Sequence, residues 1–149
     1  MKKVRRNKQH SVARIFFIAY CVVMLWLLFG QRMNQQPSAK SMNLIPLDTL
    51  KLYANLMQSN SGYLVRHAYV NLVGNVVMFI PLGIFLPQMW AKLRGFFKVL
   101  ALTALIVIVV EGLQYLTALG SCDIDDVILN IPGAMLGYIF WSVFCRKRT

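Results

Sequence analysis

Three pairs of polar residues interrupt long apolar stretches of this sequence. The members of each pair are three or four residues apart, a spacing that places both on one face of a helix. The pairs are Asn71 and Asn75, Glu111 and Gln114, and Asp126 and Asn130. Polar groups inside membrane spans are costly and usually face the interior of a helix bundle or a wet cavity. We therefore expect the pairs to converge at one depth, beside Asp123 in the loop before the third pair.

Glu111 and Asp126 are the candidate catalytic residues. Glu111 with Asp123 or Asp126 could form a carboxylate pair that acts as general acid and base. The same carboxylates with Asn130 could surround a hard cation, but no fixed ligand spacing supports this and no metal ligand is assigned. All of the polar side chains are candidates for binding a ligand. These candidates are Asn71, Asn75, Glu111, Gln114, Asp123, Asp126 and Asn130.

Structural roles compete with function for some of these side chains. Asparagine and glutamine can hold one membrane helix to another, each contributing about 0.6–2 kcal/mol. Glu111 is different, because a carboxyl group in a span must be neutral or have a charged partner, such as Arg66 or Lys51. A functional role is therefore favoured for Glu111.

The aspartates around residue 125 also have simpler explanations. Asp123 and Asp125 are expected in a loop near water, where solvation accounts for them. Asp126 could stabilise the N-terminus of the following helix through the helix dipole. A solvated acidic loop is thus the alternative to a functional site here.

Motifs for a cofactor or a metal are not found in the sequence. There is no glycine-rich phosphate loop and no HExxH motif. His10 and His67 do not suggest a Ser-His-Asp set, and Cys21, Cys122 and Cys145 show neither a disulfide framework nor zinc spacing. We predict neither a cofactor nor a metal site.

The polar pairs lie in apolar segments that are long enough to span a membrane. A spanning helix needs about 20 mainly apolar residues, and this chain is 58% hydrophobic and only 14% charged. We expect an all-α integral membrane bundle of four transmembrane helices with a short interfacial helix in the first outer loop. The predicted division is a basic N-terminus at 1–14, a first span at 15–30, an outer loop at 31–67, a three-helix core at 68–145 and a tail at 146–149. Within the core the spans are 68–91, 99–119 and 127–145.

The first span follows a positively charged segment and could be read as a cleaved secretory signal. Its apolar run is long and contains Trp26, which favours an uncleaved anchor.

The basic residues predict the orientation. The chain has 16 Lys and Arg against 5 Asp and Glu, and 12 of the basic residues form three clusters beside apolar segments: before residue 15, at 92–98 and after residue 145. Basic residues concentrate in cytoplasmic segments. Both termini should therefore be cytoplasmic in a multi-pass protein of the cell (plasma) membrane. Nucleic acid is a poor explanation for this charge, because the clusters flank the spans.

The first outer loop should contain a short helix at 49–58. Asp48 is a plausible N-cap, and Leu50, Tyr53 and Met57 recur at helical spacing. This helix either lies in the outer membrane interface or packs on the bundle as an ordinary loop helix.

Glycines and prolines predict where the helices pack and bend. Gly133 and Gly137 form a small-xxx-small face that permits close approach of a neighbouring helix, or of a partner chain. Pro81 and Pro132 each remove a helical hydrogen bond, which predicts a kink or break in the second span and a kink in the fourth. Gly83 and Pro87 should make the inner half of the second span irregular.

Three blocks of this sequence resemble the VanZ-like membrane proteins, a family named for a teicoplanin-resistance protein. The first block is 43–47, Asn-Leu-Ile-Pro-Leu. The second joins Asn-Leu-Val-Gly-Asn at 71–75 to Phe-Ile-Pro-Leu-Gly at 79–83. The third begins with Glu-Gly-Leu-Gln at 111–114 and runs through 123–130 to Gly133 and Gly137. The order, spacing and residue types of the blocks together make the resemblance specific.

The resemblance implies a cell-envelope role, with reduced sensitivity to teicoplanin-type lipoglycopeptides in the member that gave the family its name. It does not imply a known reaction. The chain departs from the family pattern at Pro132, and at 119–121 it reads Leu-Gly-Ser where many members have an arginine. A mechanism that uses that arginine is therefore doubtful here.

Three functions follow as hypotheses. The leading one is recognition or handling of an envelope amphiphile, either a membrane lipid or a lipid-linked envelope precursor, in an outward-facing polar pocket with apolar walls. The second is an integral-membrane enzyme that uses Glu111 and Asp126. The third is a structural or regulatory subunit whose partner helix binds at Gly133 and Gly137.

The orientation makes a direct prediction. Single cysteines placed at 31–67, in a chain without its native cysteines, should react with a membrane-impermeant maleimide added to intact cells, because that loop is expected outside. Cysteines placed at 92–98 should react only after the membrane is permeabilised. Labelling of 92–98 in intact cells would refute this orientation.

Overall fold

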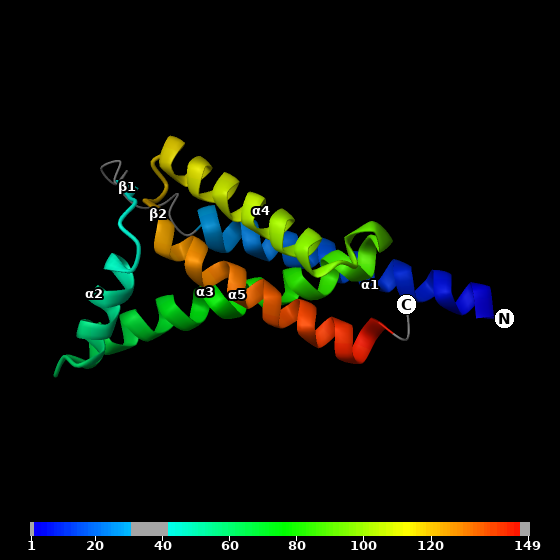
Figure 1. Cartoon of the computed structure of the whole chain (residues 1–149), viewed down its shortest axis with the longest axis horizontal. Helices are drawn as coiled ribbons and strands as arrows, with labels where there is room; N and C mark the ends of the chain where they lie inside the picture. The colour runs from blue at the N-terminus through cyan, green and yellow to red at the C-terminus, as the bar shows by residue number, and fades with distance from the viewer. Residues whose placement is uncertain (1, 31–41, 147–149) are drawn as a thin grey trace.

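The structure is a computed structural model, and it describes residues 2–30 and 42–146. The described chain is an all-α bundle, as the sequence predicts (Figure 1). It also has one short two-stranded contact that the sequence analysis does not predict. The helices are α1 (Lys2–Leu25), α2 (Asp48–Met57), α3 (Gly62–Met89), α4 (Phe96–Leu116) and α5 (Ile124–Phe140). Single helical turns extend or join them: η1 (Trp26–Gly30), η2 (Ala91–Leu93) and η3 (Trp141–Cys145). The strands β1 (Met42–Asn43) and β2 (Cys122–Asp123) pair in parallel.

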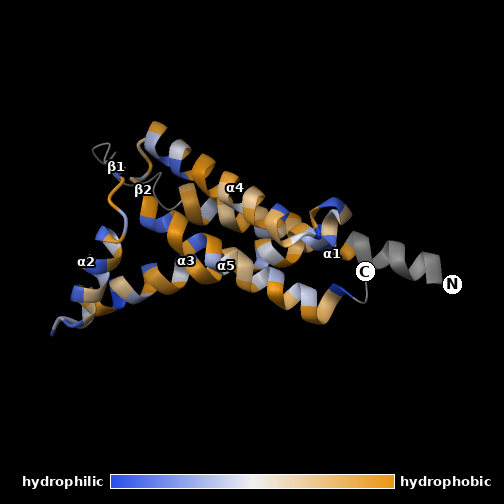
Figure 2. Cartoon of the chain, viewed as in Figure 1, coloured by the Kyte–Doolittle hydropathy of each residue, from blue (hydrophilic) through white to orange (hydrophobic). Residues whose placement is uncertain are grey.

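Four helical segments within the described residues are long and apolar enough to cross a membrane. They are Val12–Gly30, Gly62–Met89, Phe96–Leu116 and Ile124–Cys145. Large apolar side chains such as Phe16, Phe97 and Phe144 are exposed on their outer faces, and hydrophobic residues run along the length of these helices (Figure 2). Such faces are stable in lipid, where no hydrophobic penalty applies to them.

The centre of the bundle is the contact between α3 and α5. A Cβ atom added at Gly133 would overlap the carbonyl oxygen of Val76, and one at Gly137 would overlap that of Ile80. From the opposite side, a Cβ at Gly83 would overlap the carbonyl oxygen of Ala134. The two backbones therefore touch directly, which confirms the close packing predicted for Gly133 and Gly137.

The prolines do not interrupt the helices. α3 runs unbroken through Pro81 and Pro87 to Met89. Of the kink or break predicted at Pro81, the break is therefore excluded, and the irregular inner half predicted from Gly83 and Pro87 is wrong. α5 likewise continues through Pro132. Membrane helices tolerate proline because neighbouring groups satisfy the backbone atoms that it frees. Gly83 instead provides space for the backbone of α5.

The first span packs on α3 through aromatic side chains. The Tyr20 hydroxyl donates a hydrogen bond of 3.0 Å to the Met78 carbonyl. The Phe17 ring lies 5.6 Å from the rings of both Phe85 and Trp90. These contacts hold α1 against one side of the bundle.

The loop helix α2 packs across one end of the bundle (Figure 1). It contacts α3 and α5, so it packs on the bundle whether or not it also lies in the membrane interface. It begins at Asp48, and Leu47 is the N-cap residue with φ of 69°. The prediction of Asp48 as N-cap is therefore wrong, because the groups that cap α2 come from another helix.

The glycine contact predicts a size limit at residue 137. Gly137→Leu should force α5 away from α3 and lower the free energy of unfolding in detergent. Overpacking typically costs about 1–3 kcal/mol. The cost here should be larger, because the atom in the way belongs to the backbone. Thermal unfolding of the purified protein measures this. Gly74→Leu is the matched control, since a Cβ at Gly74 meets nothing within 4 Å. Equal melting temperatures for the two variants would contradict the assigned interface.

Candidate functional site

A cluster of polar side chains lies at the end of the bundle that carries α2. It brings together α3, α4, α5, α2 and the segment that leads into α2. We refer to these residues as the polar cluster: Asn43, Thr49, Asn75, Glu111, Asp123, Asp125, Asp126 and Asn130.

Asp123 connects three parts of the cluster. Its Oδ2 accepts a hydrogen bond of 2.6 Å from the Thr49 hydroxyl, and its Oδ1 accepts from the Asn43 amide at 3.4 Å. The same Oδ1 accepts from the backbone N–H of Asp125 at 2.9 Å, which caps α5. The backbone N–H of Asp123 donates to Glu111 Oε2 at 3.0 Å, which joins the loop to α4.

Asp125 caps α2 from a different helix. Its carboxylate is fully buried and accepts from the backbone N–H of Leu47 at 2.6 Å and of Leu50 at 3.0 Å. The first N–H groups of a helix have no intrahelical partner, and a negative charge is favourable there. Asp125 therefore fixes the N-terminus of α2 against α5.

These bonds overturn the solvated-loop explanation. Asp123 is 8% exposed and Asp125 is 0% exposed. Asp125 was not among the sequence candidates. The available signal was that residues 43–47 and 123–130 are conspicuous blocks of one sequence pattern, and the structure places the two blocks in contact.

Asp126 connects α5 to α3. Its Oδ1 accepts a hydrogen bond of 2.6 Å from the amide nitrogen of Asn75. This bond directly joins two of the three predicted polar pairs.

Two candidate residues make their hydrogen bonds elsewhere. Asn71 donates to the His67 carbonyl of its own helix at 2.8 Å. Gln114 is buried and donates to the Leu28 carbonyl at 2.9 Å, which joins α4 to η1. The structure therefore does not join Asn71 or Gln114 to the polar cluster by these bonds.

Asn130 is the member of the polar cluster whose side-chain oxygen has no partner among the described residues. Its side chain is 4% exposed, and its Oδ1 has no hydrogen-bond partner among the described residues. It lies one turn beyond Asp126 on the same face of α5. A second buried acceptor without a partner, Thr103 Oγ1, lies on α4.

The cluster is negatively polarised and rich in acceptors. Glu111 is 4% exposed, and the donor to its Oε2 is a backbone N–H. Partial burial, together with the nearby carboxylates of Glu111 and Asp123, raises the pKa of the Cys122 thiol. Among the described residues, no group of three or more His, Cys, Asp and Glu side chains is placed to hold a metal ion.

Comparisons with known proteins agree with the sequence resemblance. The VanZ/LLP1 family model matches residues 15–145, most of the chain. Protein VanZ of Enterococcus faecium is 35% identical over 66 residues, which cover 44% of this chain and 40% of that protein. No solved structure matches. The extent of the family match and the four apolar helices lead to one conclusion: the chain belongs to the VanZ/LLP1 family and is a multi-pass membrane protein of the VanZ-like type.

Proposed function

We propose that this protein has a cell-envelope role and binds the polar head of an envelope amphiphile at the polar cluster. In this proposal both termini are cytoplasmic and the cluster faces outward. The ligand is a membrane lipid or a lipid-linked envelope precursor. By its relation to VanZ-like proteins, we further propose that it lowers sensitivity to teicoplanin-type lipoglycopeptides.

The observation that carries the proposal is Oδ1 of Asn130, which is buried and has no hydrogen-bond partner among the described residues. A buried acceptor without a donor costs about 1–3 kcal/mol, so a native protein rarely keeps one without a use. A ligand that donates a hydrogen bond at this point would remove that cost.

The chemistry of the cluster supports a ligand rich in donors. Glu111, Asp123, Asp125 and Asp126 offer carboxylate oxygens, which only accept hydrogen bonds when ionised. Hydroxyl, amide and ammonium groups are the complementary donors, and the head groups of lipids and of lipid-linked precursors carry them. The apolar helices around the cluster would hold the hydrocarbon part of the same molecule.

Access to the cluster depends on α2. The bonds that hold its first turn on α5 end on two side chains, those of Asp123 and Asp125. The donors from α2 occupy acceptors that a ligand would otherwise use. Displacement of the first turn of α2 is therefore the proposed route of entry.

The two alternative functions are supported less well. Gly133 and Gly137 already contact α3 of the same chain, so they need no partner protein to explain them. An enzyme that uses Glu111 and Asp126 requires both carboxylates to reach a substrate, whereas Asn75 and the backbone of Asp123 are bonded to them. Turnover of a lipid-linked substrate by the purified protein would support the enzyme instead.

The proposal predicts that the carboxylates act as a unit. Glu111→Gln and Asp126→Asn should each return teicoplanin susceptibility of expressing cells to the level of cells without the protein, because loss of one member already disables the site. The double variant should be no worse than either single variant, with membrane insertion and protein levels near normal. Strictly additive partial losses, or failure of either variant to accumulate, would favour a purely structural cluster.

Substitutions at Asn75 and Asn71 can be compared in the same susceptibility measurement. Both are asparagines on α3, one turn apart, but only Asn75 bonds to Asp126. Asn75→Ala should reduce protection against teicoplanin and Asn71→Ala should not. The same response to both substitutions would contradict the geometry.

A separate prediction concerns Asn130. Asn130→Leu removes the unpaired acceptor at similar volume, so the purified protein should keep its melting temperature or gain a few degrees. Mass spectrometry of the lipids retained through purification should show the loss of a species that the wild type carries, as it should for Glu111→Gln. A lowered melting temperature with an unchanged lipid profile would assign Asn130 a structural role.

A further inference from the structure

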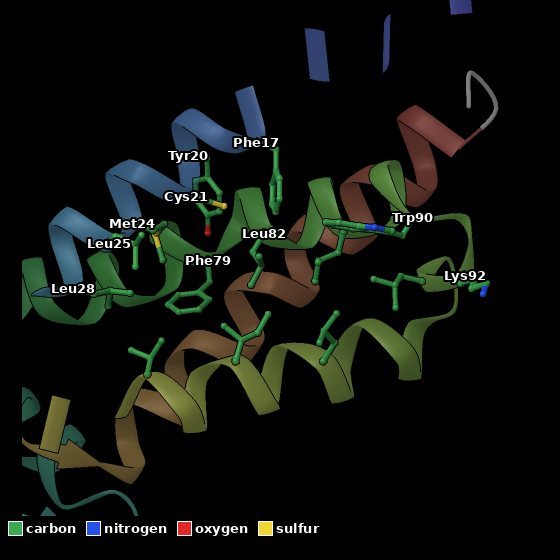
Figure 3. A pocket seen from close by; sticks show the side chains of 15 residues that line it. Phe17, Tyr20, Cys21, Met24, Leu25, Leu28, Phe79, Leu82, Trp90 and Lys92 are labelled. Atoms are coloured by element: carbon green, nitrogen blue, oxygen red, sulfur yellow. The ribbon is translucent and has the colours of Figure 1, made fainter. Parts of the chain in front are cut away.

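A second feature, away from the polar cluster, is an apolar cavity between α1, α3 and α4. Its volume is about 630 Å³, within the range of about 300–1,000 Å³ typical of small-molecule sites. Figure 3 shows it as a long space with Leu28 at one end and Lys92 at the other. The proposed function makes no use of this space.

The walls of the cavity suit a hydrocarbon chain. The one hydroxyl that lines it, on Tyr20, donates its hydrogen to the Met78 carbonyl. Along α3 and the residue that follows it, the lining extends from Phe79 to Trp90, which is about 16 Å at the rise of a helix. That length is close to half of the roughly 30 Å hydrocarbon core of a bilayer. The cavity therefore has the length of one acyl chain in one leaflet.

The end of the cavity at η2 is positively charged. Lys92 is the one charged side chain among the 15 described residues that line it. The segment 91–98 also contains Arg94 and Lys98, and it has no acidic residue. Trp90, an interfacial type of residue, stands beside Lys92 at this end (Figure 3).

Arg94 lies in the same segment but does not line the cavity. Its guanidinium carbon lies 6.0 Å from the centre of the Trp141 ring, beside η3, and its Nε is buried without a hydrogen-bond partner among the described residues. Among the described residues that line the cavity, the positive charge at this end therefore comes from Lys92.

We infer that the cavity binds one chain of an anionic glycerophospholipid, with the phosphate at Lys92. The predicted orientation places this lipid in the cytoplasmic leaflet, where anionic lipids attract basic segments. The site is at the other end of the helices from the polar cluster, and it does not depend on what the cluster binds.

The test uses the full-length protein purified in detergent and mixed with micelles that contain equal amounts of phosphatidylglycerol and phosphatidylcholine with identical acyl chains. Native mass spectrometry counts the lipids that remain bound. The wild type should prefer phosphatidylglycerol by about fivefold, since one basic residue near an anionic head group contributes about that factor. Lys92→Gln should reduce the preference to near one.

Lys98→Gln is the matched control for charge. It removes the same charge from the same segment, but Lys98 does not line the cavity, so the preference should persist. If both substitutions lowered the preference equally, general surface charge would explain the preference, and the proposed site would be wrong. Equal binding of the two lipids by the wild type would also overturn the site.

Leu102 and Leu105 provide the control for the chain. Leu102 lines the cavity, whereas Leu105 is on the same helix and is 58% exposed. Leu102→Phe should lower the occupancy of both lipids severalfold, and Leu105→Phe should leave it unchanged. Full occupancy in Leu102→Phe would refute the chain site. Glu111→Gln should keep the phosphatidylglycerol preference, because Glu111 belongs to the polar cluster. The experiment can therefore refute the cavity site without refuting the proposed function of the polar cluster.

Discussion

The carboxylate of Asp125 is the interaction on which the α2 end of the molecule depends. A fully buried carboxylate is stable only when donors surround it, and the donors here are the backbone N–H groups of Leu47 and Leu50. The requirement is mutual, because the first turn of α2 needs an acceptor that its own sequence does not supply. One charge thus determines where α2 lies, and α2 in turn brings Thr49 to Asp123.

Close backbone packing of α3 on α5 sets the distance at which the other cluster bonds can form. With glycines at 83, 133 and 137, the two helices approach until carbonyl oxygens touch the opposite backbone. Short side chains can then bridge them, as Asn75 and Asp126 do at 2.6 Å. In a membrane, where apolar faces gain nothing from leaving lipid, such contacts supply the cohesion that a soluble bundle takes from its hydrophobic core.

The two ends of the bundle have opposite chemistry, and this polarity organises the proposed functions. At the α2 end, Asn130 Oδ1 is a buried acceptor without a hydrogen-bond partner among the described residues. At the η2 end, Arg94 Nε and Trp141 Nε1 are buried donors without such a partner. The apolar cavity between α1, α3 and α4 extends along the helices toward the second end. A head group rich in hydrogen-bond donors and an anionic lipid would therefore bind at different ends of the bundle.

The sequence by itself determined the membrane class, the four helices and the close contact of Gly133 and Gly137, because apolar length, helical phase and missing side chains are local properties. It also predicted that Glu111, Asp126 and Asn75 would turn inward, since lipid excludes them. Only the tertiary structure decided that α3 passes unbroken through Pro81, that Asn71 bonds within its own helix, and that Asp125 is buried rather than solvated. The burial of Asp125 depends on donors that are distant along the chain, the backbone N–H groups of Leu47 and Leu50. Spacing within one segment carries no information about which donors another segment will bring.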